Sequence, residues 1–258
     1  MNNRSIAFER IFNARDLGGL QTAQGRTISS GLLLRSANLA DATEKDKRVL
    51  REQYHIAKII DLRTETERKE KPDVSLPNVD YRSIPIFDGS IAGISHEKSL
   101  SKERLLAVVP KMGQLYRKMV TNESYRQNLG KAARCVMEHD FSKGSVLWHC
   151  TEGKDRCGLL SAVLLFALGV ERSTIVEDYM LTNNVNGVKS ERYYQMMLTA
   201  GKTETEAATI RDVFLAKEEY LQEAFLAIDE QYINIDQFLR DGLCIPKKLI
   251  ERFQESVL

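Results

Sequence analysis

The chain has 258 residues, of which 43% are hydrophobic and 28% are charged, and its 37 basic and 36 acidic side chains leave a formal net charge of +1 at pH 7. This composition is ordinary for a folded globular protein and excludes a disordered chain. The balanced charge also argues against a protein that holds nucleic acid or an anionic membrane through a global electrostatic field.

Two features predict a cytoplasmic protein without stable membrane insertion. The longest apolar run, Leu159–Leu168, is much shorter than the ~20 residues that span a bilayer. The first residues, MNNRSIAFER, have no apolar stretch of the kind found in signal peptides. The cysteines are too sparse for a disulfide framework and form no Cys/His cluster with zinc-site spacing.

The first part of the chain predicts short strands around one helix. Residues 31–35 (GLLLR) are typical of a short buried strand. Thr43 has the character of an N-cap for a helix that runs to about Tyr54. Residues 57–62 (AKIIDL) then form an apolar run that ends in polar residues, the pattern of a strand buried on both faces.

The following stretch predicts a short helix and another strand. Thr64 and Glu67 have the spacing of a capping box, which marks the start of a helix. Pro72 ends this helix, because proline cannot continue the hydrogen-bond ladder. Residues 79–86 are the next expected strand.

Helical patterns dominate the remainder. Residues 102–120 and 124–138 predict amphipathic helices, residues 145–148 (SVLW) a strand, and residues 158–168 an apolar helix. Everything from residue 173 onward is typical of helices.

Strands that alternate with helices predict an α/β fold with a central, mostly parallel sheet flanked by helices. The chain contains no repeat and no linker rich in Gly, Ser or Pro, so we expect one domain over residues 1–258. A helical insertion over residues 89–140 could close over the site as a lid. The C-terminal third would be helical.

The segment with the clearest chemistry is His149–Gly158 (HCTEGKDRCG), which joins a predicted strand to a predicted helix. Ligands of parallel α/β folds bind at the carboxyl ends of strands, and a helix N-terminus presents unpaired N–H groups with a partial positive charge. Gly153 lets the loop bend so that successive N–H groups point inward. The segment therefore predicts an anion site.

Two interpretations of this loop can be separated by spacing. A Walker nucleotide loop would need a glycine at position 148 and Ser or Thr at position 155, where the chain has Trp148 and Asp155. The other spacing is a cysteine, five residues and an arginine, which places Cys150 and Arg156 around the same anion. This arrangement suits attack of a thiolate on phosphorus.

Energetics show why the whole loop is needed. Lowering the pKa of a cysteine from ~8.5 by about three units takes ~4 kcal/mol of preference for the thiolate. A helix terminus alone supplies ~0.3–2 kcal/mol. Charge-assisted hydrogen bonds of ~1.5–3 kcal/mol each, from the loop amides and Arg156, must therefore contribute as well.

HCTEGKDRCG resembles the HCxxGxxR(S/T)G signature of cysteine-dependent tyrosine and dual-specificity phosphatases. Its GKDR core resembles more narrowly the bacterial tyrosine/serine phosphatase family, which includes phosphoinositide-active members. Asn13–Gly19 (NARDLGG) resembles that family's NFRDLGG, Leu34–Ser36 its LYRS, and Asp61–Thr64 its DLRS. Near the C-terminus, Ile228–Tyr232 (IDEQY) and Ile235–Leu239 (IDQFL) also resemble that family, so the resemblance covers nearly the whole chain.

The resemblance implies that Cys150 forms a phosphocysteine intermediate and that Arg156 holds the phosphoryl oxygens. It implies that a run of backbone amides surrounds the phosphate: Thr151, Glu152, Gly153, Lys154, Asp155 and Arg156. We expect no cofactor and no metal, because arginine and amides supply the positive charge that Mg²⁺ gives a kinase. His149 is expected to order the loop through a hydrogen bond.

Two aspartates are candidates for the general acid that protonates the leaving oxygen. Asp155 lies in the loop, where the family carries an aspartate, and we prefer it. Asp88 follows a predicted strand, where related phosphatases place an acid on a mobile loop. Lys154 favours a highly anionic substrate such as an inositol phosphate, although lysine there also suits phosphotyrosine.

The chain departs from the signature at Cys157, where the wider pattern has Ser or Thr. In the family that hydroxyl donates a hydrogen bond to the nucleophilic sulfur, and a thiol is a weaker donor. We therefore expect slower hydrolysis of the phosphoenzyme. We also hypothesise that Cys157 captures an oxidised Cys150 as a disulfide, which would prevent over-oxidation.

The sequence thus predicts a metal-independent phosphatase whose expected substrate is phosphotyrosine in proteins. The alternatives are a phosphoinositide or phosphoserine/threonine phosphatase, and a phosphate-binding module with impaired turnover. The expected partner is a phosphorylated protein or phosphoinositide and not a nucleic acid, while the oligomeric state is not predicted. Four charged residues are candidates for ion pairs that hold loops near the site: Arg15, Asp16, Arg35 and Arg63.

Overall fold

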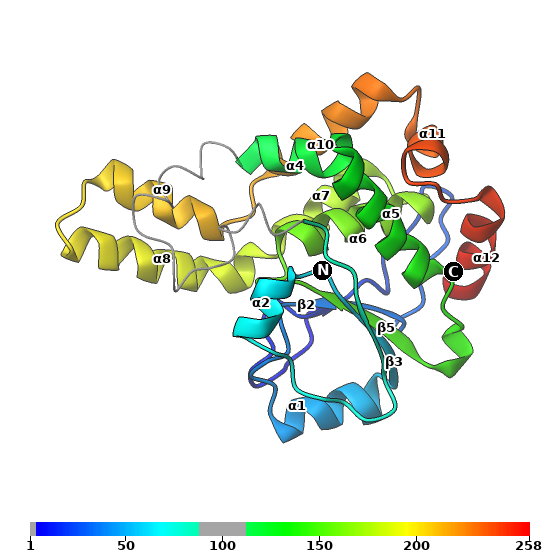
Figure 1. Ribbon diagram of the computed structural model, residues 1–258, viewed down its shortest axis with the longest axis horizontal. Helices are drawn as coiled ribbons and strands as arrows, with labels where there is room; N and C mark the ends of the chain where they lie inside the picture. Colours follow the sequence, from blue (N-terminus) through cyan, green and yellow to red (C-terminus); the bar gives the residue numbers. More distant parts are fainter. Residues whose placement is uncertain (1–3, 88–111) are drawn as a thin grey trace.

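The computed structural model describes residues 4–87 and 112–258 and places a five-stranded sheet between layers of helices (Figure 1). The strands lie in the order β1-β2-β5-β3-β4. Their bounds are Arg15–Asp16 (β1), Leu33–Ser36 (β2), Ile56–Asp61 (β3), Asp80–Ser83 (β4) and Ser145–His149 (β5). Strand β1 pairs antiparallel with β2, and the other three pairings are parallel. The predicted mostly parallel α/β sheet is confirmed.

The sheet register brings three strand ends to one level. Ser36 at the end of β2 and Asp61 at the end of β3 both pair with His149 at the end of β5. The segments that follow these strands therefore leave the sheet at the same edge. The loop from His149 to Gly158 begins at the centre of that edge.

Each central strand is buried on both faces, as its continuous apolar run predicts. Val146 and Trp148 of β5 face the larger hydrophobic core, and Leu147 between them faces a smaller core on the other side. This alternation follows from the two-residue period of a strand. Helix α6 (Asp155–Ala167), which follows β5, is buried almost all round and lies within the larger core.

Capping residues set the starts of the first two helices. Thr43 caps α1 (Glu44–Arg48), which continues as a π-helical turn over Val49–Gln53. Thr64 and Glu67 form the predicted capping box of α2 (Glu65–Glu70). Strand β4 is shorter than the predicted strand over residues 79–86.

The insertion is described from residue 112 onward as α4 (Met112–Thr121) and α5 (Glu123–Met137). The expected start of its first helix lies outside the described residues. The closing of this insertion over the site as a lid and the single domain over residues 1–258 remain predictions. In Figure 1, α4 and α5 lie on the same side of the sheet as α6, and α1 lies on the opposite side.

The C-terminal third is helical, as predicted. Its helices are α7 (Arg172–Met180), α8 (Asn183–Thr199), α9 (Glu204–Phe214), α10 (Glu218–Gln231), α11 (Ile235–Gln237) and α12 (Lys247–Val257). Helices α8 and α9 form a hairpin that projects from the body with a small core of its own (Figure 1). Among the residues described, every helix is too short or too polar to cross a bilayer.

Candidate active site

The segment between β5 and α6 is a tight, buried loop at the carboxyl edge of the sheet. Cys150 is 2% exposed and Arg156 is 3% exposed. Gly153 has a φ of +64°, and a Cβ atom there would lie 2.6 Å from the carbonyl carbon of Ser36. Glycine is therefore required at this position both for its backbone conformation and for the close approach of β2.

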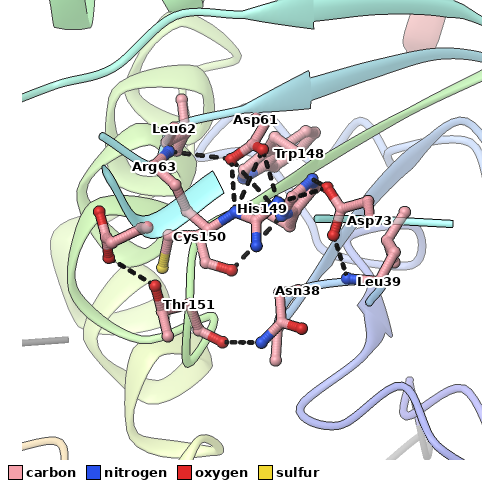
Figure 2. A network of polar contacts seen from close by, with 12 residues as sticks. Asn38, Leu39, Asp61, Leu62, Arg63, Asp73, Trp148, His149, Cys150 and Thr151 are labelled. Atoms are coloured by element: carbon pink, nitrogen blue, oxygen red, sulfur yellow. Dashed lines mark hydrogen bonds and ion pairs between the residues drawn. The ribbon is translucent and has the colours of Figure 1, made fainter. Parts of the chain in front are cut away.

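The first two carbonyls of the loop are bound from outside the loop (Figure 2). The carbonyl oxygen of Cys150 lies 3.3 Å from Nδ1 of His149. The carbonyl oxygen of Thr151 accepts hydrogen bonds from the side-chain amide of Asn38 at 2.9 Å and from its backbone N–H at 3.2 Å.

The next three carbonyls are bound from outside as well. Nδ2 of Asn13 donates to the carbonyls of Glu152 and Gly153 at 3.0 Å each. The Arg35 guanidinium donates to the carbonyl of Gly153 at 2.8 Å and to that of Lys154 at 3.4 Å. In a trans peptide the N–H points opposite to the carbonyl. The N–H groups of residues 151–155 therefore face the centre that the loop surrounds, which is the geometry of an anion-binding nest.

A buried carboxylate holds the arginines behind the loop. Asp178 of α7 forms ion pairs with Arg4 at 2.8 Å, Arg15 at 3.2 Å and Arg35 at 3.4 Å. Burial raises the pKa of Asp178, but the arginines outweigh it and lower the pKa to about 2. The predicted structural ion pairs of Arg15 and Arg35 are confirmed, with a partner that the sequence did not indicate.

Asp16 has a different role from the predicted ion pair. Its carboxylate accepts the backbone N–H groups of Gly18 at 2.8 Å and Gly31 at 2.6 Å. Asp16 therefore closes a turn beside β1 and is bonded to backbone amides at both oxygens.

Arg156 is fixed by an ion pair with Glu67 of α2. The two terminal nitrogens of the Arg156 guanidinium each lie 2.7 Å from a different carboxylate oxygen of Glu67. Burial raises the pKa of Glu67, but Arg156 overcomes this effect and holds the pKa well below its usual range. The guanidinium plane is thereby locked beside Cys150.

Glu67 joins the helix cap to the loop. Its carboxylate accepts the backbone N–H of Thr64 at 2.8 Å, which is half of the predicted capping box. It also accepts the hydroxyl of Thr151 at 2.6 Å. The capping box was predicted, but the contacts of Glu67 with Arg156 and Thr151 were not, because no local pattern encodes them.

The environment of Cys150 favours its thiolate. Burial raises the pKa of the Cys150 thiol, but the hydrogen bond from the Cys157 thiol, the charge of Arg156 and the backbone N–H of Cys157 lower it to about 6. An ordinary cysteine titrates near ~8.5. Most of Cys150 is therefore ionised at neutral pH.

Cys157 lies fully buried in the first turn of α6, with its thiol directed at Cys150. Two carbonyl oxygens compete for its single proton, those of Ser36 at 3.6 Å and Trp148 at 3.9 Å. Burial raises the pKa of Cys157 well above its usual value, so this residue remains a thiol and serves as the donor.

The side chains of Asp155 and Lys154 lie at the start of α6. The Asp155 carboxylate accepts a hydrogen bond from the hydroxyl of Tyr116 in α4 at 2.8 Å, and its side chain is 16% exposed. The Lys154 ammonium donates to the carbonyls of Val213 at 2.5 Å and Leu215 at 3.2 Å. Lys154 therefore anchors the end of α9, and its ammonium also lies 3.5 Å from the Asp155 carboxylate.

The second candidate for the general acid, Asp88, lies outside the described residues. The residue before it, Phe87, is described, and its ring centroid lies 5.5 Å from the guanidinium carbon of Arg156. At the outer side of the loop, Glu152 forms an ion pair with Lys189 of α8 at 3.0 Å. The α8–α9 hairpin is thus tied to the loop at two points, through Lys154 and Lys189.

A cluster of buried charges lies behind His149 (Figure 2). Asp61, Asp73 and His149 bring one ligand atom each within 4.8 Å of one another, a set that resembles a metal site. The Arg63 guanidinium already binds both carboxylates, at 2.7 Å for Asp61 and 2.6 Å for Asp73. The hydroxyl of Tyr81 bonds to both as well, so both carboxylates already have partners within the protein. The predicted ion pairing of Arg63 is confirmed.

Comparisons with known proteins place this site in a family. Among solved structures, TpbA of P. aeruginosa aligns with a TM-score of 0.37 and 15% identity, over 84% of this chain and 89% of that chain. A Cupriavidus necator protein named as a tyrosine-protein phosphatase is 29% identical over 241 residues, which cover 92% of this chain and 84% of that protein. The triple specificity protein phosphatase PtpB of Mycobacterium tuberculosis is 26% identical over 260 residues, covering 90% and 91% respectively. The model of the tyrosine phosphatase family matches residues 6–258, and the chain belongs to that family.

Proposed function

We propose that this phosphatase hydrolyses phosphomonoesters through a phosphocysteine formed on Cys150. The observation that carries the proposal is that one loop holds both Cys150, whose pKa is about 6, and Arg156, which is fixed by Glu67. The inward N–H groups of residues 151–155 complete a site for the three phosphoryl oxygens. These groups supply positive charge where negative charge develops in the transition state.

The first step transfers the phosphoryl group to the protein. The Cys150 thiolate attacks phosphorus, while Arg156 and the loop N–H groups hold the non-bridging oxygens. The leaving oxygen takes a proton from a general acid, for which Asp155 is preferred and Asp88 is the alternative. In the second step a water molecule attacks phosphorus and the same carboxylate accepts a proton from that water, while the P–S bond breaks to release phosphate and the Cys150 thiolate.

Phosphotyrosine in proteins is the proposed substrate. The Lys154 ammonium lies 3.5 Å from the Asp155 carboxylate and donates to two backbone carbonyls, and Lys189 is paired with Glu152 at 3.0 Å, so each of these two lysines already has an acidic partner. A polyphosphorylated inositol would require such charge for its additional phosphates. A phosphotyrosine places a single phosphate in the loop and an uncharged ring outside it. Phosphoinositides and phosphoserine/threonine remain the alternatives.

Turnover of p-nitrophenyl phosphate in EDTA tests the mechanism. We expect wild-type activity, complete loss in Cys150→Ser, and little change in the matched control Cys244→Ser, whose cysteine is exposed. Acid quenching followed by peptide mass spectrometry should find one phosphoryl group on the Cys150 peptide. Activity that survives Cys150→Ser would rule out the mechanism. Tight phosphate binding without turnover would instead identify a phosphate-binding module.

Competition between substrates tests the proposed class. We expect phosphotyrosine peptides to be hydrolysed with a higher kcat/KM than phosphoserine peptides or inositol phosphates. Glu152→Gln should improve relative activity on inositol phosphates, because it frees the charge of Lys189. Glu177→Gln, an exposed change on α7, is the control. A preference of the wild type for inositol phosphates would overturn the substrate proposal and leave the mechanism intact.

A further inference from the structure

Asp73 contacts both of the segments that bind the first two carbonyls of the loop (Figure 2). Its Oδ2 lies 3.1 Å from Nε2 of His149, whose Nδ1 is 3.3 Å from the Cys150 carbonyl. Its Oδ1 accepts the backbone N–H of Leu39 at 2.8 Å. Leu39 follows Asn38, which donates to the carbonyl of Thr151. One carboxylate in the segment between α2 and β4 thus supports two consecutive loop carbonyls.

The contacts of His149 define its protonation. A carbonyl oxygen only accepts hydrogen bonds, so Nδ1 must carry a proton to bond to Cys150. Nε2 lies 3.1 Å from the Asp73 carboxylate without the geometry of a hydrogen bond, so a proton on Nε2 makes this contact an ion pair, whereas a bare Nε2 would turn its lone pair toward a negative charge. An imidazolium therefore suits both contacts, and a neutral ring suits only one of them.

The surroundings of His149 balance this charge. Asp61 and Asp73 provide two negative charges, and Arg63 and His149 provide two positive charges. Tyr81 donates its hydroxyl to the carboxylates. Burial lowers the pKa of His149, but the two carboxylates overcome this effect and raise the pKa above its usual value.

Asp73 and Asp61 are not equivalent partners of the ring. Both oxygens of Asp61 bond to Nε of Arg63, and the nearest approach of Asp61 to His149 is 3.9 Å, beyond a hydrogen bond. Asp73 is the carboxylate within direct reach of the imidazole. Asp61 therefore serves to hold Arg63, whereas Asp73 contacts the residues that bind the loop.

We propose that Asp73 is a positioning residue for the phosphatase reaction, which it serves by holding His149 as an imidazolium that keeps the Cys150 carbonyl turned away from the anion site. This inference rests on the proposed function of Cys150. When the carbonyl is held outward, the N–H of Thr151 in the same peptide points inward to the phosphoryl oxygens. Loss of the Asp73 charge would leave a neutral ring, whose hydrogen bond to the Cys150 carbonyl is weaker than that of an imidazolium, so the first peptide of the nest would be held less firmly.

The variant Asp73→Asn tests the proposal, because its amide oxygen can still accept the Leu39 N–H while the charge is removed. We expect kcat/KM for p-nitrophenyl phosphate to fall about tenfold or more, the loss of one charge-assisted hydrogen bond. The matched control Asp80→Asn removes a partly exposed carboxylate of β4 and should leave kcat/KM within about twofold.

NMR of the histidine side chain measures the protonation of His149, which would not change if Asp73 had only a structural role. We expect His149 of the wild type, assigned by comparison with His149→Asn, to lose its proton at a higher pH than an ordinary histidine, whose pKa is ~6.5. In Asp73→Asn it should lose the proton at a lower pH than in the wild type. A wild-type His149 that titrates at or below the ordinary value would overturn the proposal even if Asp73→Asn failed to fold.

A double-mutant cycle tests whether Asp73 acts through the ring. In a His149→Asn background, Asp73→Asn should change kcat/KM by less than about twofold. A full tenfold loss in that background would overturn the proposal. The NMR result does not depend on turnover. An inactive wild type with a charged His149 would contradict the proposed function and the role of Asp73 in the reaction. The protonation of His149 would still be established.

Discussion

Glu67 and Arg156 lie face to face, joined by two hydrogen bonds of 2.7 Å, although 89 residues of sequence separate them. A guanidinium is planar, so fixing one edge orients its other N–H group. The same carboxylate caps α2 through Thr64 and accepts the hydroxyl of Thr151. Glu67 therefore couples the start of a helix to the orientation of the arginine that would hold the phosphoryl oxygens.

Removing the charge of Glu67 should damage both stability and catalysis. In Glu67→Gln, Arg156 becomes a buried charge without its carboxylate partner, and we expect the free energy of unfolding to fall by about 3 kcal/mol. We expect kcat/KM to fall at least tenfold, because the guanidinium plane is no longer fixed. Urea denaturation and p-nitrophenyl phosphate hydrolysis measure the two effects. Glu65→Gln, on the exposed side of the same helix, is the control, and equal losses in both variants would contradict the assignment.

The ionisation of Cys150 should appear as a pH-dependent rate of alkylation. Because its pKa is about 6, the thiolate fraction should rise between pH 5 and pH 7 and then level off. The rate of inactivation by iodoacetamide should follow this curve, with its midpoint well below the ~8.5 of an ordinary cysteine. Peptide mapping separates Cys150 from the exposed Cys244. A midpoint near that of Cys244 would show that the loop does not stabilise the thiolate.

Replacing Cys157 with threonine should speed the second half of the reaction. A hydroxyl is a stronger donor than a thiol, and a gain of ~1 kcal/mol corresponds to about fivefold faster phosphoenzyme hydrolysis. Quenched-flow measurement of phosphocysteine in Cys157→Thr should therefore show a smaller steady-state fraction than in the wild type. Cys135→Ser, a cysteine of α5, is the control. An unchanged fraction would mean that the donor at position 157 does not limit this step.

Cys157 should also protect Cys150 from irreversible oxidation. Hydrogen peroxide converts the Cys150 thiolate to a sulfenic acid, and attack by the Cys157 sulfur then gives a disulfide and releases water. A dithiol reductant should restore the wild type after peroxide treatment, whereas Cys157→Thr should recover less and accumulate sulfinic acid. Activity assays and peptide mass spectrometry follow both products. Equal recovery of activity in the two proteins would contradict a protective role of Cys157.

The two candidate acids should separate by their dependence on the leaving group. If Asp155 donates the proton, Asp155→Asn should lower kcat about 10²-fold for a phenyl phosphate, with a smaller loss for p-nitrophenyl phosphate, whose leaving group needs less protonation. Asp88→Asn is the parallel experiment, and Asp140→Asn is the control on an exposed turn. This dependence on the leaving group in Asp88→Asn alone would transfer the role to Asp88.

Local patterns predicted the parts of the fold whose partners are near in sequence. The capping box of Thr64 and Glu67 was predicted because its two members are three residues apart. The apolar runs of β3 and β5 predicted buried strands because each side chain faces a core. The cysteine-to-arginine spacing predicted the loop because one strand-to-helix turn holds both residues.

Long-range partners could not be predicted in the same way. Asp178 lies 163 residues from Arg15, and no periodicity indicates that the two meet. Lys154 was expected to face an anionic substrate, but the end of α9 brings the carbonyls of Val213 and Leu215 to its ammonium. Such contacts depend on how the helices pack, which a single sequence does not display.

The carbonyls of the loop are held outward by residues outside the signature, so the signature sequence cannot form the phosphate site by itself. Side chains from two distant stretches, one with Asn13 and the other with Arg35 and Asn38, fix the peptide orientations between Thr151 and Lys154. A synthetic peptide with the sequence HCTEGKDRCG would therefore sample many backbone conformations and bind phosphate weakly. A protein engineer who transplants this decapeptide into another scaffold would need to transplant its amide and guanidinium donors as well.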